Sequence, residues 1–263
     1  MEEITLLKFT LRLYNYVAAK YGFKRIVTPS IKKHRSIVAE RINQLLERTT
    51  SKRYLEIGVY KGFTFELIRA RQRKGIDPKP KCKLFPKNHN FSLETLQSDD
   101  FFAIKASDIQ IFDVVYVDGL HDFRQCYRDV VNSINILSDE GFVLVDDVKP
   151  ANTAAATKFI DFNENLANLV DTQETDWQGD VFLVIETLTK FHHREVEIWT
   201  LKSEGRLQTV VKKKDAVKQI SCLHDSSLKQ VESISFEEYF SKGIPESWNL
   251  VDDGYFFEKV LQL

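Results

Sequence analysis

Two uninterrupted apolar segments constrain the fold of this chain more than any other feature of its sequence. One runs from Phe112 to Val117 and the other from Gly141 to Val145, and both are rich in β-branched and aromatic residues. Neither alternates between apolar and polar side chains, which is typical of central parallel strands that are buried on both faces. A sheet of this kind needs helices on both of its faces, so these segments predict an α/β fold.

Helical and strand patterns alternate along the chain around these two segments. Helical spacing or capping signals predict helices at 4–19, 31–48, 63–71, 99–105, 122–137, 181–187, 235–241 and 253–262. Further strands are predicted at 53–57, 75–78 and 91–96, with a loop over 78–92. This alternation predicts a parallel sheet with right-handed crossovers. Residues 195–201 and 207–211 differ, because the turn between them predicts a hairpin.

The length of the chain and its apolar content favour one large domain over two small ones. The chain has 263 residues, of which 43% are hydrophobic, and this is enough to form a full core. It contains no internal repeat and no low-complexity linker. We assign residues 1–50 to an N-terminal helical extension packed on the core, and residues 51–263 to the main domain.

Charge and cysteine usage limit the partners and the compartment. The net charge of −1 lacks the basic excess of a nucleic-acid binder, and the run Lys212–Lys214 is too short to change that. The chain begins with acidic residues where a signal peptide is basic, and Lys8 and Arg12 interrupt its first apolar segment, so no membrane insertion is expected. Three cysteines without metal-like spacing favour reduced thiols in the cytoplasm.

Acidic or glycine-bearing segments follow the predicted strands. They are residues 56–64, Asp77, Asp118 and the pair Asp146–Asp147, with Ser98–Asp100 joining them. In an open α/β sheet, ligands bind beyond the carboxyl ends of the strands. The sequence therefore predicts a ligand site built from these segments.

The turn after the first strand carries Gly58 and Gly62. Glycine permits backbone conformations that other residues avoid, and it lets a ligand approach closely, so a side chain at Gly58 is expected to prevent binding. The fingerprint Gly-x-Gly-x-x-Gly is absent, which counts against a dinucleotide-binding oxidoreductase. S-adenosylmethionine (SAM) has no phosphate and carries an ammonium group, which suits the nearby acidic residues, and Asp77 is placed to accept its ribose hydroxyls. The alternative is that both glycines are ordinary loop residues.

Residues 53–62 resemble the first motif of class I SAM-dependent methyltransferases. Residues 75–78, 98–102 and 112–121 follow in the order of that family's motifs. Trp177, Gly179, Asp180 and Val181 are similar to a late motif of a bacterial branch associated with sugar and surface-polysaccharide modification. The resemblance covers about residues 50–215, and the loop over 78–92 and Val148 depart from it. It implies a Rossmann-like, mostly parallel sheet of seven strands, with an antiparallel last strand and helices on both faces.

The resemblance also implies a cofactor and a set of contacts for the domain at 51–263. The cofactor is SAM, and the acceptor is a small molecule, with a sugar or a sugar nucleotide suspected. The sequence leaves a homodimer open. The implied cofactor contacts are Glu56, Gly58, Tyr60, Gly62, Thr64, Asp77, Ser98, Asp99 and Asp118, with Asp99 near the adenine.

Methyl transfer to a hydroxyl requires an aligned acceptor and a group that removes its proton. His121 and Asp118 leave a central strand at the reactive end of the cofactor. We therefore predict them as catalytic residues, with His121 as the general base because its unperturbed pKa is about 6.5. The alternative is that His121 only bonds the backbone in a turn at the start of a helix, where Asp122 could be the N-cap.

Asp118, Asp146 and Asp147 resemble the acidic trio that binds Mg²⁺ in macrocin-type sugar O-methyltransferases. A metal held there would acidify the acceptor hydroxyl. Adjacent strand residues point to opposite faces, so Asp146 and Asp147 can share a ligand only if the chain turns. The alternative is that one caps a turn and the other faces solvent. Trp177 and Asp180 could wall the acceptor site, although Asp180 could equally cap a helix.

These observations predict transfer of a methyl group from SAM to an oxygen of a small polar acceptor. N-methyl transfer to an amine or amide is the nearest alternative, because it needs less help from a base. A nucleotide-binding oxidoreductase and a binding module without activity are alternatives from other classes.

Overall fold

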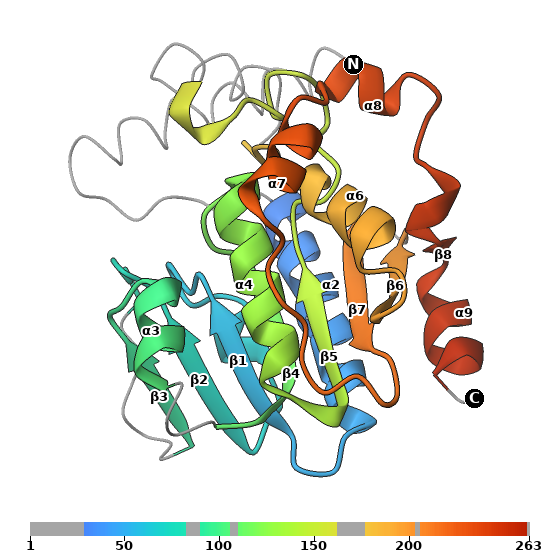
Figure 1. The fold of residues 1–263 in the computed structure, drawn as a ribbon. Helices are drawn as coiled ribbons and strands as arrows, with labels where there is room; N and C mark the ends of the chain where they lie inside the picture. Colours follow the sequence, from blue (N-terminus) through green and yellow to red (C-terminus); the bar gives the residue numbers. More distant parts are fainter. Residues whose placement is uncertain (1–28, 83–89, 106–109, 162–176, 203–205, 262–263) are drawn as a thin grey trace, which may run out of the picture.

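The computed structural model describes residues 29–82, 90–105, 110–161, 177–202 and 206–261 (Figure 1). Its strands are β1 (Arg53–Ile57), β2 (Gln72–Ile76), β3 (Phe91–Glu94), β4 (Phe112–Val117), β5 (Leu137–Val145), β6 (Val196–Leu201), β7 (Gln208–Lys213) and β8 (Leu250–Val251). Its helices are α2 (Pro29–Glu47), α3 (Ser98–Lys105), α4 (Phe123–Asn135), α6 (Phe182–Phe191), α7 (Asp225–Glu232), α8 (Phe236–Phe240) and α9 (Asp253–Tyr255). Short helical turns are η1 (Phe65–Leu67), η2 (Phe159–Asp161), η3 (Glu246–Trp248) and the π-helical η4 (Phe256–Val260).

The strands form one sheet in the order β3-β2-β1-β4-β5-β7-β6-β8. Strand β7 runs antiparallel to both of its neighbours, β5 and β6, while the other pairs are parallel. The predicted α/β class is therefore confirmed. The predicted antiparallel last strand of a seven-stranded sheet is also confirmed, and it is β7. The described sheet has eight strands rather than seven, because the short β8 adds to the edge of β6 at Thr200 and Leu201.

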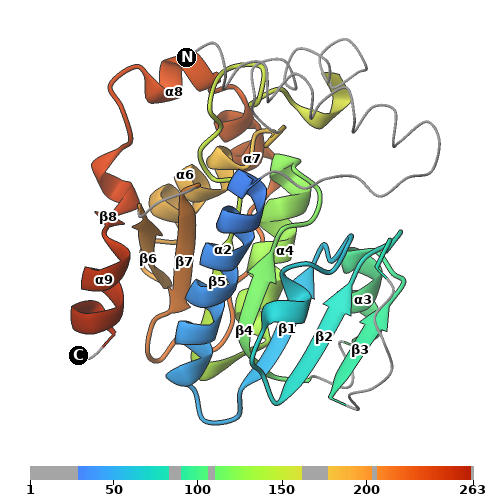
Figure 2. The ribbon, with the colours of Figure 1, turned by 180° about the vertical axis from the view of Figure 1, so that it is seen from behind.

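Helices cover both faces of the sheet, as the unalternating strands predicted. Helices α4 and α6 lie on the face in the foreground of Figure 1, and α2 crosses the opposite face in Figure 2. The buried apolar side chains form two hydrophobic cores. Along β4, Val115 and Val117 belong to one core, and Val114 and Tyr116 belong to the other. Alternate residues of one strand thus fill both cores, so the whole strand is buried.

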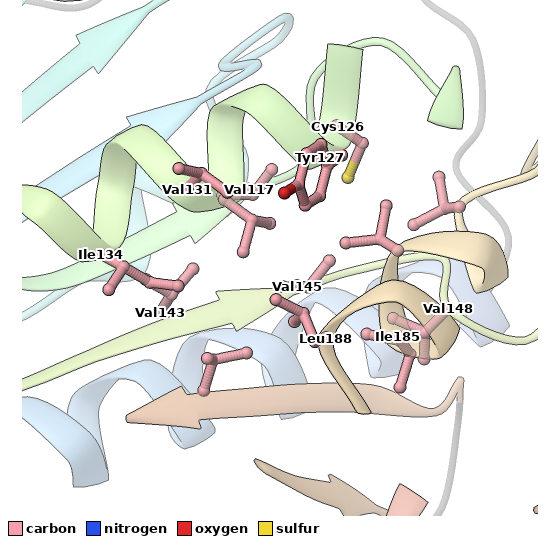
Figure 3. Packing of buried hydrophobic residues seen from close by; sticks show 14 of the residues in the cluster. Val117, Cys126, Tyr127, Val131, Ile134, Val143, Val145, Val148, Ile185 and Leu188 are labelled. Atoms are coloured by element: carbon pink, nitrogen blue, oxygen red, sulfur yellow. The ribbon is translucent and has the colours of Figure 1, made fainter. Parts of the chain in front are cut away.

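The larger core lies between α4, β5 and α6 (Figure 3). Val131 of α4, Val143 of β5 and Leu188 of α6 are all buried in it. Complete burial of such a side chain stabilises a fold by about 1.5–3 kcal/mol. Val148, which departs from the resemblance described above, is fully buried in the same core, so its apolar character has a packing role.

The helix predicted at 63–71 is wrong, since only the single turn η1 forms there. The side chain of Asn43 on α2 explains the difference. Its amide nitrogen donates to the carbonyl of Leu67 at 3.1 Å, and its oxygen accepts from the backbone N–H of Arg69 at 2.7 Å. These bonds hold the chain extended at Ile68, where ψ is 128°, so a tertiary contact overrides the local helical pattern.

Most of the other predicted elements are confirmed, but the strand predicted at 75–78 is displaced, because β2 begins at Gln72 and ends at Ile76. Helix α2 starts two residues earlier than expected, and Asp122 is the N-cap of α4, accepting from the N–H of Gln125 at 3.0 Å. The hairpin is β6–β7. The segment at 253–262 forms α9 and η4, and α7 was not predicted. The helix predicted at 4–19 lies outside the described residues, and the division at residue 50 stays a prediction.

Within the described residues, no helix combines the length and the apolar character needed to cross a bilayer.

Candidate active site

A cavity of about 980 Å³ lies along the carboxyl ends of the strands. It is lined in turn by Ser98 after β3, Asp77 after β2, Gly58 after β1 and Asp118 after β4, and then by residues that follow β5 and precede β7. The sheet order fixes this sequence of lining segments in space. The ligand site predicted at the strand ends is therefore a single elongated cavity.

The turn after β1 is shaped by positive φ angles. Gly58 has φ of +92°, and its N–H donates to the carbonyl of Ile76 at 2.8 Å. A Cβ at this position would stand 1.9 Å from the carbonyl oxygen of Asp118. Gly58 is therefore required by contact with the end of β4, whereas the sequence attributed it to contact with a ligand.

Asp77 holds this turn and also lines the cavity. One carboxylate oxygen accepts from the N–H of Tyr60 at 2.7 Å, and the other accepts from the N–H of Lys79 at 2.7 Å. Each carboxylate oxygen can accept a second bond. Asp77 can therefore fix the turn while it accepts hydroxyl groups of a bound ligand.

His121 is held between a carbonyl and two carboxylates. Its Nδ1 lies 2.9 Å from the carbonyl oxygen of Trp177, and since a carbonyl only accepts, Nδ1 carries a hydrogen. Its Nε2 lies 3.0 Å from Asp147 Oδ2 and 3.6 Å from Asp118 Oδ1. Burial lowers the pKa of His121, but the charge of Asp147 and bonds to both carboxylates outweigh it, so the pKa lies well above its usual value. The two carboxylates therefore favour the protonated form of the His121 ring.

Asp147 lies where the chain turns after β5, with φ of +56°. Its Oδ1 accepts from Arg206 at 2.7 Å and from Gln178 at 3.0 Å. Burial would raise the pKa of Asp147, but His121 and Arg206 hold it below the usual value. Burial raises the pKa of Asp118 to about 6, although the hydrogen bond with His121 opposes this. The two carboxylates next to His121 therefore differ in their affinity for protons.

Asp146 faces a different partner from Asp147. Its carboxylate accepts from the hydroxyl of Tyr116 and from the backbone N–H of Asp147. Among the described residues, the group whose ligand atoms all lie within 4.8 Å of one another is Asp118, His121 and Asp147. The structure thus brings two of the three predicted metal ligands together and adds His121, while Asp146 lines the same cavity.

Residues 55–148 match a family model described as a methyltransferase domain. The matched segment runs from β1 to the end of β5 and contains every predicted cofactor, catalytic and metal residue. The match covers about a third of the chain and is a likeness of this segment to methyltransferase domains. No curated protein sequence matches the chain significantly.

Solved structures with a similar arrangement share little sequence with this chain. The SAH-bound methyltransferase PaMTH1 of Podospora anserina is 16% identical, over 79% of this chain and 96% of its own, with a TM-score of 0.46. The N-methyltransferase NodS of Bradyrhizobium japonicum is 16% identical, over 72% and 98%, with a TM-score of 0.47. An O-methyltransferase of Bacillus cereus in complex with SAH is 13% identical, over 78% and 90%, with a TM-score of 0.44.

Most of the predicted cofactor residues line the cavity. These are Gly58, Tyr60, Thr64, Asp77, Ser98 and Asp118. Glu56 instead lies beneath it and accepts from the hydroxyl of Tyr54 at 2.6 Å, and burial raises the pKa of Glu56 well above its usual value. Gly62 closes the turn after β1 with φ of +71°.

Asp99 is placed away from the cavity lining. Its carboxylate pairs with Arg128 at 3.0 Å, and it accepts from Gln125 at 3.1 Å. The helix α3, on which it lies, exposes this side chain, whereas Ser98 at the first residue of α3 reaches the cavity.

Several cavity residues were missed from the sequence, among them Gln125 and Asp129 on α4 and Arg206 before β7. A signal for Asp129 exists, because it falls on the buried stripe of α4 with Cys126 and Val130. Trp177 lines the cavity as expected, and its ring centroid lies 5.2 Å from that of His121. Asp180 accepts from the N–H of Phe123 at 2.7 Å, so it stabilises the start of α4 rather than of α6.

Proposed function

We propose that this chain transfers a methyl group from SAM to an oxygen of a small polar acceptor, a sugar or a sugar nucleotide. The observation that carries this proposal is the placement of His121, Asp118 and Asp147 in the elongated cavity, within the segment that resembles a methyltransferase domain. A cavity of this size can hold two small molecules side by side.

The order of the strand ends suggests how the cavity is divided. SAM would lie over β3, β2 and β1, where Ser98, Asp77 and the turn at Gly58 line the cavity. The acceptor would lie over β4, β5 and β7, beside His121 and Arg206. The methyl group would then pass between the two halves near Asp118, at the centre of the sheet.

The side chains of the acceptor half can align a hydroxyl and take its proton. The carbonyl of Trp177 fixes the orientation of the His121 ring, so that Nε2 faces the cavity carboxylates. Because the carboxylates favour its protonated form, His121 can act as a base only after that proton is lost. Asp118, whose pKa is about 6, is a carboxylate at neutral pH and is the alternative proton acceptor.

The residues present also fit a divalent cation. Asp118, Asp147 and His121 would hold it, and two carboxylates with one imidazole suit Mn²⁺ or Mg²⁺, with water completing the coordination. A bound cation would lower the pKa of His121 and acidify a hydroxyl in contact with it. Asp146 would support the site by fixing Tyr116, whose hydroxyl lies 3.3 Å from Asp118 Oδ2.

A sugar acceptor is supported by the mixture of groups in this half of the cavity. Trp177 offers an aromatic ring, which the ring of Phe159 extends at a centroid distance of 6.0 Å. Arg206, Asp147 and His121 offer donors and acceptors for hydroxyl groups. Apolar ring surface combined with a few convergent polar groups is the usual composition of small-molecule sites.

Ligand binding tests the first half of the proposal. S-adenosylhomocysteine (SAH) at about 100 times its Kd should stabilise the protein by about 2.7 kcal/mol, whereas NAD should leave the melting temperature unchanged. Stabilisation by NAD but not by SAH would reject the proposal. Methyl transfer from labelled SAM to sugars and sugar nucleotides, with amines as the comparison, tests the second half. Turnover of amines alone would favour N-methyl transfer.

We also infer a cytoplasmic setting, which is supported by three cysteines that form no disulfide in the structure. A homodimer stays a prediction that light scattering on the purified protein can test.

A further inference from the structure

The segment 177–180 joins the loop that follows β4 to the loop that follows β5, because it forms hydrogen bonds with both. The residues at its two ends bond to the loop after β4, one to the ring of His121 and the other to the backbone N–H of Phe123. The two residues between them, Gln178 and Gly179, are buried and do not line the cavity. They have no part in the chemistry proposed above.

Gln178 fixes the carboxylate of Asp147 from the interior of the protein. Only 3% of Gln178 is exposed, and its amide nitrogen donates to Asp147 Oδ1 at 3.0 Å. Its backbone N–H donates to the carbonyl of Ala155 at 2.9 Å, so the residue is itself held in place. Arg206 donates to the same Oδ1, whereas Oδ2 of Asp147 lies 3.0 Å from Nε2 of His121. Gln178 therefore helps to determine which oxygen of Asp147 is turned toward His121.

Gly179 fixes the backbone of His121 from the same segment. Its φ is +61°, and a Cβ at this position would stand 1.7 Å from the carbonyl oxygen of His121. Only glycine permits the two backbones to approach this closely. Helix α6 begins soon after Gly179 and packs against α4, which begins soon after His121 (Figure 1). The contact therefore ties the loop that carries His121 to the buried core around α6.

We propose that Gln178 and Gly179 are positioning residues, which hold the Asp147 carboxylate and the His121 ring in alignment with the acceptor. This inference rests on the proposed function. Neither residue lines the cavity, so each acts through the side chain or the loop that it fixes. Misplacement of a reacting group by about 1 Å can cost about 10²-fold in rate. SAM would lie over β3, β2 and β1, away from this segment, so its affinity should depend little on either residue.

The test separates turnover from cofactor binding. Steady-state kinetics use labelled SAM and the compound that wild-type protein methylates among the sugars, sugar nucleotides and amines above, and isothermal titration calorimetry gives the Kd for SAH. Gln178→Met keeps the length of the side chain but removes the amide donor to Asp147. Its kcat should fall by at least about ten-fold, because a hydrogen bond to a charged group is worth about that factor or more. Its KM for SAM and its Kd for SAH should change less than about three-fold.

A second variant tests the backbone contact. Gly179→Ala should displace the loop that carries His121 and lower kcat by about 10²-fold, again with little change in the Kd for SAH. Gly243→Ala is the matched control, since Gly243 has φ of +88° but a Cβ there meets no atom within 4 Å. It should keep the wild-type kcat. If Gly179→Ala does not fold, Gln178→Met decides the matter.

A kcat of Gln178→Met within about three-fold of the wild-type value overturns the inference and leaves the proposed function standing. A loss of SAH affinity as large as the loss of kcat also overturns it, because the segment would then shape the whole cavity. If the wild-type protein methylates no compound of the panel, the proposed function fails and the inference fails with it.

Discussion

Replacing Gly58 by alanine should destabilise the fold itself, with or without a ligand. The Cβ of the alanine would stand 1.9 Å from the carbonyl oxygen of Asp118. An ordinary C···O contact is about 3.3 Å, so the ends of β1 and β4 would have to separate by about 1.4 Å. Both ends are fixed by backbone bonds, from Gly58 N–H to Ile76 and from Asp118 N–H to Ile57.

The expected cost has two parts. A positive φ costs an alanine about 1–2 kcal/mol, and overpacking of this kind adds about 1–3 kcal/mol. The free energy of unfolding should therefore fall by about 2–5 kcal/mol. At roughly 2–4 °C per kcal/mol for a chain of this size, the melting temperature should fall by about 4–20 °C.

Gly243→Ala is the matched control. Gly243 has φ of +88°, but a Cβ built there meets no atom within 4 Å. This variant should show only the backbone cost of about 1–2 kcal/mol. Thermal unfolding followed by circular dichroism without ligand compares the two variants. Equal melting temperatures would refute the argument, and so would a Gly58→Ala variant that keeps the wild-type melting temperature but no longer binds SAH.

Further predictions concern the two halves of the cavity. His121→Ala should lower turnover by about 10²–10⁴ while the Kd for SAH changes less than about three-fold, and steady-state kinetics with calorimetry will show whether both hold. Asp77→Ala should weaken SAH binding by about ten-fold, measured by calorimetry on folded protein. Turnover should fall as the pH drops through about 6, because Asp118 gains a proton there, and a pH-rate profile without such a fall would contradict its role. Chelation should remove activity, and added Mn²⁺ or Mg²⁺ should restore it. The Asp147→Asn variant should need a higher metal concentration to recover its activity. Full turnover in excess EDTA would exclude a role for the cation.

The burial of the central strands could be predicted because the information is local. The two apolar segments form β4 and the second half of β5, and every residue in them is buried. Their ends then place Asp118 and Asp147 at the same edge of the sheet. His121 follows Asp118 by three residues, so the pairing of these two side chains could also be expected from the sequence.

The contacts that the sequence did not predict depend on distant parts of the chain. Arg206 reaches Asp147 across 59 residues because β7 pairs with β5. Arg41 of α2 in turn donates to the carbonyl of Arg206 at 3.3 Å and to the carboxylate of Asp253 at 2.7 Å. No local pattern marks these partners. The helix expected at 63–71 failed for the same reason, since a side chain of α2 determines that backbone.

The charges under the cavity give a second reason to favour SAM over a dinucleotide, independent of the missing glycine. Asp77, Asp118, Asp146 and Asp147 all line the cavity, and they outnumber its two basic residues, His121 and Arg206, which both pair with Asp147. A pyrophosphate about 6 Å from one ionised carboxylate would be repelled by about 3 kcal/mol per charge pair, at an effective dielectric near 20. The sulfonium and ammonium groups of SAM would be attracted by the same carboxylates. A cavity lined by this cluster is therefore electrostatically suited to a cationic ligand.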